Sequence, residues 1–144
     1  MKNQEKVKIF LVDDDPLFLK LLSLEFIDKG NFEVQTFASG ELCLENLSDT
    51  PDIVVLDYHL NGVNNSAMNG IDTLIKIKAF LSTIPVIMLS SQDKIEVAVS
   101  TMYHGAFDYV VKSETSFLRL QKAIDTIFSL KKIEKELQWY MNRM

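Results

Sequence analysis

Apolar and polar residues alternate along the chain with two different periods. Short runs rich in β-branched residues, typical of strands, occur at 7–12, 32–37, 52–57, 85–90 and 107–111. Segments with the apolar spacing of helices lie between and after them, at 16–29, 39–47, 70–81, 94–104 and from 115 onward. The run at 52–57 is apolar at successive positions, as expected of a strand covered on both faces. The pattern therefore predicts an α/β fold in which five βα units form a doubly wound parallel sheet.

The first predicted helix carries both a start signal and a stop signal. Asp15 suits the N-cap position, and Pro16 suits the first helical position. Gly30 suits the left-handed residue that commonly follows the end of a helix. We therefore expect Asp15 to cap this helix rather than to take part in chemistry.

Length and composition favour one globular domain with a single hydrophobic core. The chain has 144 residues, of which 47% are hydrophobic and 24% are charged. Its formal net charge of −5 argues against direct nucleic acid binding. No apolar run approaches the roughly 18 residues needed to span a membrane, and no signal-peptide pattern is present. The single cysteine, Cys43, cannot form an internal disulfide, so a cytoplasmic location is expected.

Polar residues that could take part in binding or catalysis gather where the predicted strands end. Parallel strands bring their carboxyl ends to one edge of a sheet, and ligands bind beside that edge. The second predicted strand ends in Phe37 and adds no polar group, as expected of an edge strand. The residues that the other strands bring to this edge are Asp13, Asp14, Asp57, Ser90, Ser91 and Lys112.

Clustered carboxylates either share a proton or bind a cation. Oxygen ligands of this kind suit Mg²⁺, which usually retains several waters. Beside such an ion, Asp57 could act as a nucleophile towards phosphorus, because carboxylates form aspartyl-phosphates. Lys112 and the Ser90 hydroxyl could then offset charge on the phosphoryl oxygens.

Four motifs in this order resemble the receiver domain of two-component response regulators over residues 7–125. They are VDDD at 12–15, VVLD at 54–57, PVIMLSS at 85–91 and GAFDYVVK at 105–112. The resemblance implies a flavodoxin-like sheet of strand order 2-1-3-4-5 in a domain that spans 1–130. It also implies a signalling switch rather than an enzyme, which accepts a phosphoryl group from a histidine kinase or a phosphotransfer protein.

The same resemblance implies a role for each site residue. Asp57 would be the phosphoacceptor, and Lys112 would contact the phosphoryl group. Mg²⁺ would be held by Asp13, Asp14, Asp57 and the backbone carbonyl of His59, with Asp14 as a direct ligand. Ser90 and Tyr109 would form the switch that alters the face made by the fourth helix, fifth strand and fifth helix. His59 and Gln92 would tune dephosphorylation.

Two departures from the family pattern bear on the shape of the site. Asn61 stands where the family commonly has proline, and the matching glycine is Gly70, about five residues late, so that 62–67 reads as an inserted loop. Lys112 is followed by Ser113, where the family commonly has a proline after a cis bond. We expect the cis bond to be retained, so that the lysine still points at the phosphate.

Other interpretations stay open from the sequence. A phosphohydrolase acting through an aspartyl-phosphate would place its general acid at His59. A flavodoxin-like cofactor binder is disfavoured because three acids would repel its phosphate. Ser90 could be only structural, and Tyr109 could simply cover the sheet edge.

The last predicted helix continues beyond the domain. No glycine or proline interrupts 131–144, and apolar residues continue at spacings of three and four. We expect residues 131–144 to form a helical extension. It would serve to form a homodimer, to dock a downstream partner, or to link the domain to an output domain. A frayed or back-folded tail is the alternative.

Overall fold

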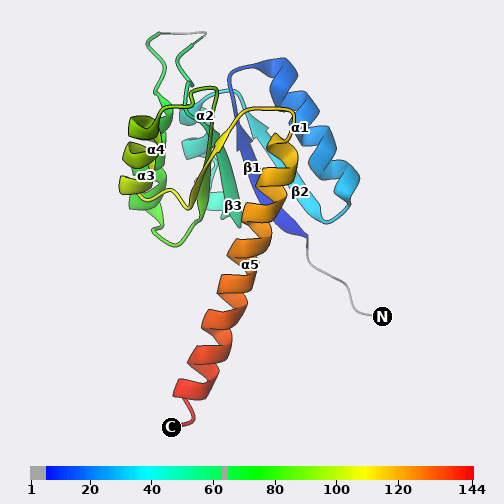
Figure 1. Ribbon diagram of the computed structural model, residues 1–144, viewed down its shortest axis with the longest axis vertical. Helices are drawn as coiled ribbons and strands as arrows, with labels where there is room; N and C mark the ends of the chain where they lie inside the picture. The colour runs from blue at the N-terminus through cyan, green and yellow to red at the C-terminus, as the bar shows by residue number, and fades with distance from the viewer. Residues whose placement is uncertain (1–5, 63–64) are drawn as a thin grey trace.

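Five parallel strands form one sheet at the centre of the protein (Figure 1). The computed structural model describes residues 6–62 and 65–144. The strand order is β2-β1-β3-β4-β5, so the expected doubly wound sheet and its order are confirmed. The strands are β1 (Val7–Val12), β2 (Phe32–Phe37), β3 (Ile53–Asp57), β4 (Val86–Ser90) and β5 (Asp108–Val111).

Helices cover both faces of this sheet. In Figure 1, α1 and α5 lie on one side, and α2, α3 and α4 lie on the other. The second helix is shorter than predicted, because the Asn46 side chain donates to the Leu42 carbonyl (2.8 Å) where the helix ends. The helices are α1 (Pro16–Lys29), α2 (Gly40–Glu45), α3 (Gly70–Phe80), α4 (Ile95–Tyr103) and α5 (Ser116–Met141), with a 3₁₀ turn η1 (Leu47–Asp49) after α2.

Two hydrophobic cores lie on the two faces of the sheet. Along β1, Ile9 and Leu11 pack with Phe26 of α1 and Ile124 of α5. Alternate residues of the same strand pack on the opposite face with α2 and α3. Successive side chains of a strand point to opposite faces, so a strand buried on both sides must be apolar throughout. This explains the unbroken apolar runs in the sequence.

The first helix begins and ends at the predicted residues. Oδ1 of Asp15 accepts hydrogen bonds from the backbone N–H groups of Leu17 (3.0 Å) and Phe18 (3.3 Å). Gly30 follows the last turn with φ of 82°, which is the left-handed region where glycine is favoured. The cap starts α1 immediately after β1, and so fixes the path of the acidic stretch between them.

Gly70 fixes the start of α3 against the end of β3. Its backbone N–H donates to the Tyr58 carbonyl (3.0 Å). A Cβ atom added here would lie 2.4 Å from the carbonyl oxygen of Asp57, so no larger residue fits without displacing the backbone. The helix therefore meets the strand at the glycine inferred from the sequence, despite the longer loop. Of the inserted loop at 62–67, Val63 and Asn64 lie outside the described residues.

The peptide bond between Lys112 and Ser113 is trans, so the expected cis bond is wrong. A trans bond is favoured by about 3 kcal/mol when the second residue is not proline. The trans backbone also lets the N–H of Ser113 donate to Oγ of Ser116 (2.7 Å) at the start of α5. Lys112 reaches the acidic residues from this backbone, so the reason for expecting a cis bond does not apply.

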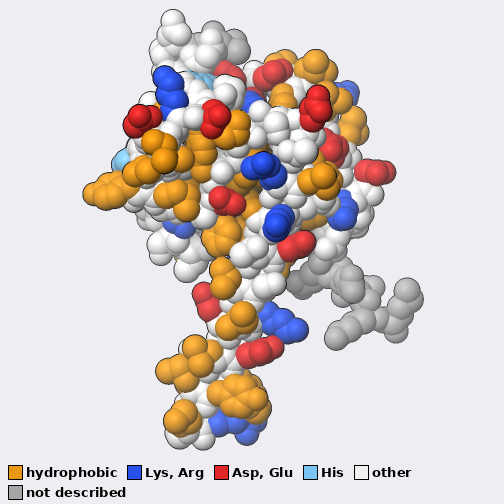
Figure 2. Space-filling view, viewed as in Figure 1, with side chains coloured by type: hydrophobic (Ala, Val, Ile, Leu, Met, Phe, Trp, Pro, Cys, Tyr) orange, Lys and Arg blue, Asp and Glu red, His pale blue; other side chains and the backbone are white. Residues whose placement is uncertain are grey.

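The last helix extends well past the sheet. Its N-terminal half packs on the body, and its C-terminal half projects from the end of the molecule opposite the β3–α3 loop (Figure 1). The helix is continuous to Met141, so the frayed or back-folded alternative is wrong. Figure 2 shows hydrophobic side chains gathered on the projecting part. Across the described residues, no helix has both the length and the apolar character that a bilayer crossing requires.

Candidate functional site

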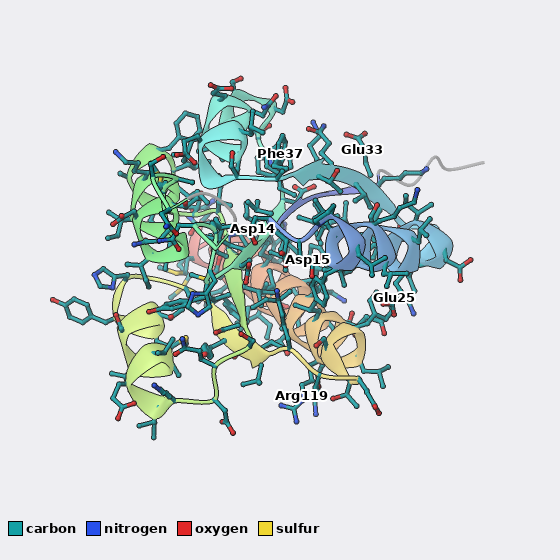
Figure 3. All side chains as sticks on the ribbon, turned by 90° about the horizontal axis from the view of Figure 1, so that it is seen from above. Asp14, Asp15, Glu25, Glu33, Phe37 and Arg119 are labelled. Carbon is teal, nitrogen blue, oxygen red and sulfur yellow. The ribbon has the colours of Figure 1, made fainter. Side chains whose placement is uncertain are left out.

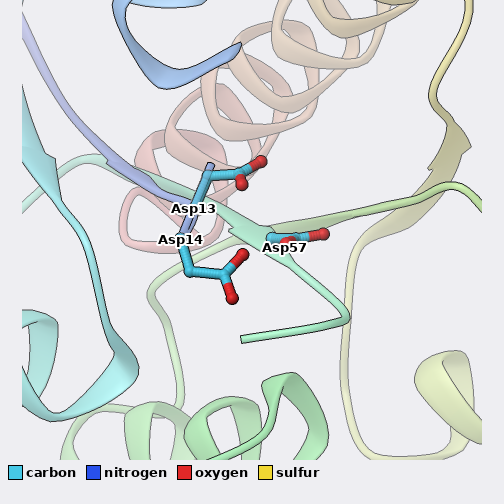
Figure 4. Close-up of side chains that lie close together, drawn as sticks. All are labelled: Asp13, Asp14 and Asp57. Carbon is cyan, nitrogen blue, oxygen red and sulfur yellow. The ribbon is translucent and has the colours of Figure 1, made fainter. Parts of the chain in front are cut away.

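Three carboxylates meet at the carboxyl edge of the sheet (Figure 4). Asp13 and Asp14 follow β1, and Asp57 is the last residue of β3. The register of these neighbouring strands pairs Val12 with Leu56, which places Asp13 beside Asp57. One oxygen of each carboxylate lies within 4.8 Å of one oxygen of each of the others. Asp13 and Asp57 are buried and Asp14 is partly exposed, so the cluster opens to solvent on one side.

Lys112 brings the opposite charge to this cluster from the end of β5. Its backbone N–H donates to the Ser90 carbonyl (2.8 Å), which anchors the residue beside β4. Its Nζ lies 2.9 Å from Oδ2 of Asp13 and 3.3 Å from Oδ1 of Asp57. The ammonium also lies 4.4 Å from the ring centroid of Phe18, in a cation–π contact.

Phe18 is a site residue that the sequence analysis missed. It is an apolar residue in the first turn of α1, and its spacing is that of a core position. Only the packing of α1 against the end of β5 places the ring under the ammonium group. Its position three residues after Asp15 is the one signal that could have drawn attention to it.

The electrostatics of the site depend on burial and on charge crowding. Burial and the neighbouring Asp13 raise the pKa of Asp57 to about 7, although Lys112 and the backbone N–H of His59 partly offset this. Burial lowers the pKa of Lys112, but hydrogen bonds and attraction from Asp13 and Asp57 outweigh it, and the net shift is upward. Three carboxylates facing one ammonium leave an excess of negative charge when all are ionised, which favours binding of a cation.

The donor set fits Mg²⁺. All three side chains offer carboxylate oxygens, the ligands that hard divalent cations prefer. A Cβ atom built on Gly62 would lie 3.4 Å from Oδ2 of Asp14 and 4.0 Å from the His59 carbonyl oxygen. These two oxygens therefore border the same small space, which Gly62 leaves open. The acidic triad therefore has the ligand chemistry of a Mg²⁺ site.

An open cavity surrounds these groups. Figure 3, seen from above, shows Asp14 and Asp15 where β1 passes into α1, and Phe37 apart from them at the end of β2. Ser91 lines the cavity, whereas Ser90, the predicted switch hydroxyl, is fully buried beside it. The lining residues are Asp13, Asp14, Asp15, Pro16, Asp57, His59, Gly62, Ser91 and Lys112.

A chain of hydrogen bonds joins the remaining predicted site residues. Oγ of Ser90 accepts from the backbone N–H of Gln92 (3.0 Å). The hydroxyl of Tyr109 donates to the backbone carbonyl of Gln92. The Gln92 side chain is bonded to Nε2 of His59 (2.9 Å). Tyr109 therefore does more than cover the sheet edge, because its hydroxyl turns inward to the β4–α4 loop.

Residues 9–125 match the family model of the response regulator receiver domain. The chain belongs to this family. Among curated proteins, this receiver domain is 34% identical over 117 residues to a protein-glutamate methylesterase/protein-glutamine glutaminase of Clostridium acetobutylicum. That match covers 78% of this chain and 32% of the relative, so the chain spans about a third of the relative's length.

Solved structures resemble this receiver domain in the same region. NtrX from Brucella abortus is 30% identical with a TM-score of 0.77, and the match covers 91% of this chain and 30% of that one. A BeF₃-activated DrrB receiver domain is 28% identical with a TM-score of 0.70, and the match covers 83% of this chain and 98% of that one. The protein is thus a phosphoacceptor module of two-component signalling with an acidic pocket at the carboxyl edge of its sheet.

Proposed function

We propose that Asp57 is the phosphoacceptor of this receiver domain and that phosphorylation switches its partner-binding face. The observation that carries the proposal is the position of the Asp57 carboxylate. It ends the central strand β3, lines an open cavity, and lies within reach of both other acids and of Lys112. Asp13 is less suited to the role, because its oxygens are engaged by Lys112 (2.9 Å) and by the backbone N–H of Asp15 (2.9 Å).

The transfer step uses groups that lie together in the cavity. An Asp57 carboxylate oxygen bonds to phosphorus while the bond from phosphorus to the donor breaks, and its electron pair leaves with the donor. Lys112 offsets negative charge on the transferred oxygens, and Asp13 holds it in place. Asp13, Asp14, Asp57 and the His59 carbonyl would hold Mg²⁺, which neutralises phosphoryl charge when bound.

The donor would be a histidine kinase or a phosphotransfer protein. Receiver domains interact with histidine kinases, and an exposed apolar stripe beside the site supports a protein donor. The stripe begins at Leu17, next to Pro16 at the cavity, and continues along α1. A partner helix could pack along it while placing its phosphoryl group at the cavity. Its other members are Leu21, Leu24 and Ile27.

The response to phosphorylation would pass through Ser90 and Tyr109. A phosphoryl group on Asp57 would attract the Ser90 hydroxyl and weaken the bond between Ser90 and the Gln92 N–H. This would shift the preferred position of the Tyr109 side chain in the space between α4 and β5. The face that would change carries exposed apolar side chains for a downstream partner, among them Ile95, Val99 and Tyr103 of α4.

The projecting part of α5 would pair with a second copy of the chain. Its apolar residues follow the three-four spacing of a coiled coil and are exposed. The stripe is rotated roughly 110° around the helix from the residues that pack on the body, so the body does not cover it. In a parallel pair, Glu134 faces Ser129 of the second copy and Glu136 faces Met141, so no like charges meet. The stripe consists of Leu130, Ile133, Leu137 and Tyr140.

The phosphoacceptor is tested by intact-protein mass after incubation with acetyl phosphate. The expected result is a gain of one phosphoryl group that requires Mg²⁺, is absent in Asp57→Asn, and persists in Asp125→Asn, an exposed aspartate on α5. An equal gain in Asp57→Asn would place the acceptor elsewhere. No gain in the folded wild type with Mg²⁺ would contradict the proposed function. Turnover of a generic phosphate monoester would instead favour a phosphohydrolase.

A further inference from the structure

The aromatic ring of Phe18 contacts the Lys112 ammonium group beside the acidic site. Nζ of Lys112 lies over the face of this ring, 4.4 Å from its centroid. The same nitrogen lies 2.9 Å from Oδ2 of Asp13 and 3.3 Å from Oδ1 of Asp57. An ammonium group has three N–H donors and no acceptor. Two carboxylates and one aromatic ring, each from a different part of the fold, therefore share one cation.

The backbone of Phe18 is fixed at the start of α1. Its N–H donates to Oδ1 of Asp15 (3.3 Å), the residue that caps the helix. The N–H of Asp15 in turn donates to Oδ1 of Asp13 (2.9 Å). The Phe18 ring is half-buried and packs against the hydrophobic core on the α1 and α5 side of the sheet. The ring therefore cannot move far from Lys112 without leaving a gap in that core.

The contact is of a kind that leucine could not supply. The face of an aromatic ring carries negative charge density, and this charge attracts a cation placed over it. The attraction strengthens where water is excluded, and the Lys112 side chain is only 20% exposed. Leucine would fill much of the same volume but would offer no such face. The ring therefore adds an electrostatic contribution to its contribution from packing.

We propose that Phe18 is a positioning residue for phosphoryl transfer, whose ring holds the Lys112 ammonium beside Asp57 as the phosphoryl group arrives. The inference rests on the proposed function, because it needs Asp57 to be the acceptor. It deepens that function by giving a neutral, apolar residue of α1 an electrostatic role in the reaction. Phe18 acts through Lys112 and does not itself touch the phosphoryl group.

The two carboxylates hold the ammonium less firmly in the form that reacts. An oxygen of Asp57 bonds to phosphorus while the bond from phosphorus to the donor breaks with its electron pair, so Asp57 loses negative charge during the step. Mg²⁺ held by the same acids would compete with Lys112 for the charge that remains. The ring of Phe18 bonds neither phosphorus nor metal. Its attraction for Lys112 therefore persists while the ammonium turns from Asp57 to a phosphoryl oxygen.

The rate test measures phosphorylation by acetyl phosphate at saturating Mg²⁺, using intact-protein mass at timed intervals. Phe18→Leu should be about three- to tenfold slower than wild type, as expected for loss of a partly desolvated cation–π contact. The Mg²⁺ concentration that gives half the maximal rate should not change, because Phe18 is not a ligand. Phe18→Tyr keeps the ring face and should restore most of the rate. In a Lys112→Met background, Phe18→Leu should cause no further loss.

Phe32→Leu is the matched control. Phe32 is another half-buried ring packed against the same core, but it stands at the first residue of β2, at the opposite end of the strands from the acidic site. The same replacement there removes a similar amount of packing without touching Lys112. This variant should phosphorylate at the wild-type rate.

Stepwise fluorination of the Phe18 ring separates attraction from packing. Fluorine withdraws charge from the ring face and changes the shape of the ring little, so each added fluorine weakens the attraction for a cation. Phenylalanine analogues with one, two and three fluorine atoms, introduced at position 18 by codon suppression, should slow phosphorylation in that order. The same analogues at position 32 should have no effect on the rate.

A second readout requires neither phosphate nor metal. Protons that lie over the face of an aromatic ring resonate upfield in NMR spectra. The ε-methylene protons of Lys112 should therefore stand apart from those of the exposed lysines, and Lys112→Met assigns them by their loss. Phe18→Leu should return them to the range of exposed lysines, whereas Phe32→Leu should leave them in place.

The outcomes separate the inference from the proposed function. A wild-type rate in Phe18→Leu, or an equal loss of rate in Phe18→Leu and Phe32→Leu, would overturn the inference alone. Rates that do not follow the number of fluorine atoms would overturn it as well. A wild-type chain that takes up no phosphoryl group would contradict the proposed function and the inference with it.

Discussion

Nζ of Lys112 lies 2.9 Å from Oδ2 of Asp13, at a separation of 99 residues along the chain. This ion pair ties the end of β5 to the end of β1 across the intervening strands β3 and β4. It also keeps the ammonium within 3.3 Å of Oδ1 of Asp57, so one cation serves both buried acids. The pair therefore connects the stability of the sheet edge with the chemistry proposed for Asp57.

Replacing Lys112 by methionine should slow phosphorylation by acetyl phosphate at least about tenfold. Among the residues that the structure describes, Lys112 carries the ammonium group beside Asp57. Removing a group that stabilises developing charge commonly lowers the rate by a factor of about 10² or more. Intact-protein mass at timed intervals measures the rate. Lys131→Met, in the projecting part of α5, is the matched control and should phosphorylate as wild type does. Equal rates in both variants would exclude a catalytic role for Lys112.

Asp57→Asn should stabilise the metal-free protein near neutral pH. The pKa of Asp57 is raised from 3.8 in the unfolded chain to about 7 in the folded state. The carboxyl therefore contributes fully to the free energy of unfolding below the unfolded pKa, and this contribution is lost as the pH rises through about 7. Charging the buried group costs up to about 4 kcal/mol on this basis. Asparagine carries no charge and avoids the cost.

Urea unfolding in the presence of a chelator measures this effect. The stability advantage of Asp57→Asn should be largest at about pH 8 and should shrink towards about pH 3, below the unfolded pKa, where the wild-type carboxyl is mostly protonated in both states. Added Mg²⁺ should stabilise the wild type more than the variant. An advantage that is constant across this pH range would mean that the charge of Asp57 is not its cause.

Gly70→Ala should destabilise the domain by about 2–4 kcal/mol. The added Cβ would lie 2.4 Å from the Asp57 carbonyl oxygen, so either α3 or the end of β3 must move. Such a shift would also slow phosphorylation, because Asp57 lies at that strand end. Gly30→Ala is the control: its Cβ meets nothing within 4 Å, and only its φ of 82° costs about 1 kcal/mol. Similar losses of free energy of unfolding in both variants would contradict the packing argument.

Asp14→Asn should weaken Mg²⁺ binding more than about tenfold, because a neutral amide replaces a charged ligand. Calorimetric titration of the metal-free protein measures the affinity. Asp15→Asn is the matched neighbour, since asparagine also caps helices and Asp15 serves α1 in that way. Its affinity should stay close to wild type. If both variants bind Mg²⁺ equally well, Asp14 is not a ligand.

Leu137→Lys should reduce self-association through α5. The residue lies in the middle of the exposed stripe, and a buried lysine in a two-stranded coiled coil is costly. Sedimentation at several protein concentrations, with and without beryllofluoride as a phosphoryl mimic, measures the change. Gln138→Lys, on another face of the same turn, should behave as wild type. A wild-type chain that is monomeric under all conditions would contradict pairing of this segment.

The order of strands and helices follows from local sequence, and so do the identities of the residues that form the acidic site. Strands and helices differ in the period of their apolar residues, and the buried strands of this sheet show that period clearly. Parallel strands must deliver their last residues to one edge, so Asp13, Asp57 and Lys112 could be assigned to one site without coordinates. Caps at Asp15 and Gly30 are likewise local, because they satisfy backbone groups of adjacent turns.

Tertiary structure alone decided the contacts between side chains distant in sequence. The ring of Phe18 lies near Lys112, and Gln92 bonds to His59, because helices and loops from separate βα units pack side by side. The raised pKa of Asp57 also depends on burial and on neighbours brought together by folding. Such contacts are set by strand register and by burial, which sum over the whole core. A local pattern of residues therefore determines which groups reach the site, and packing determines what each group touches there.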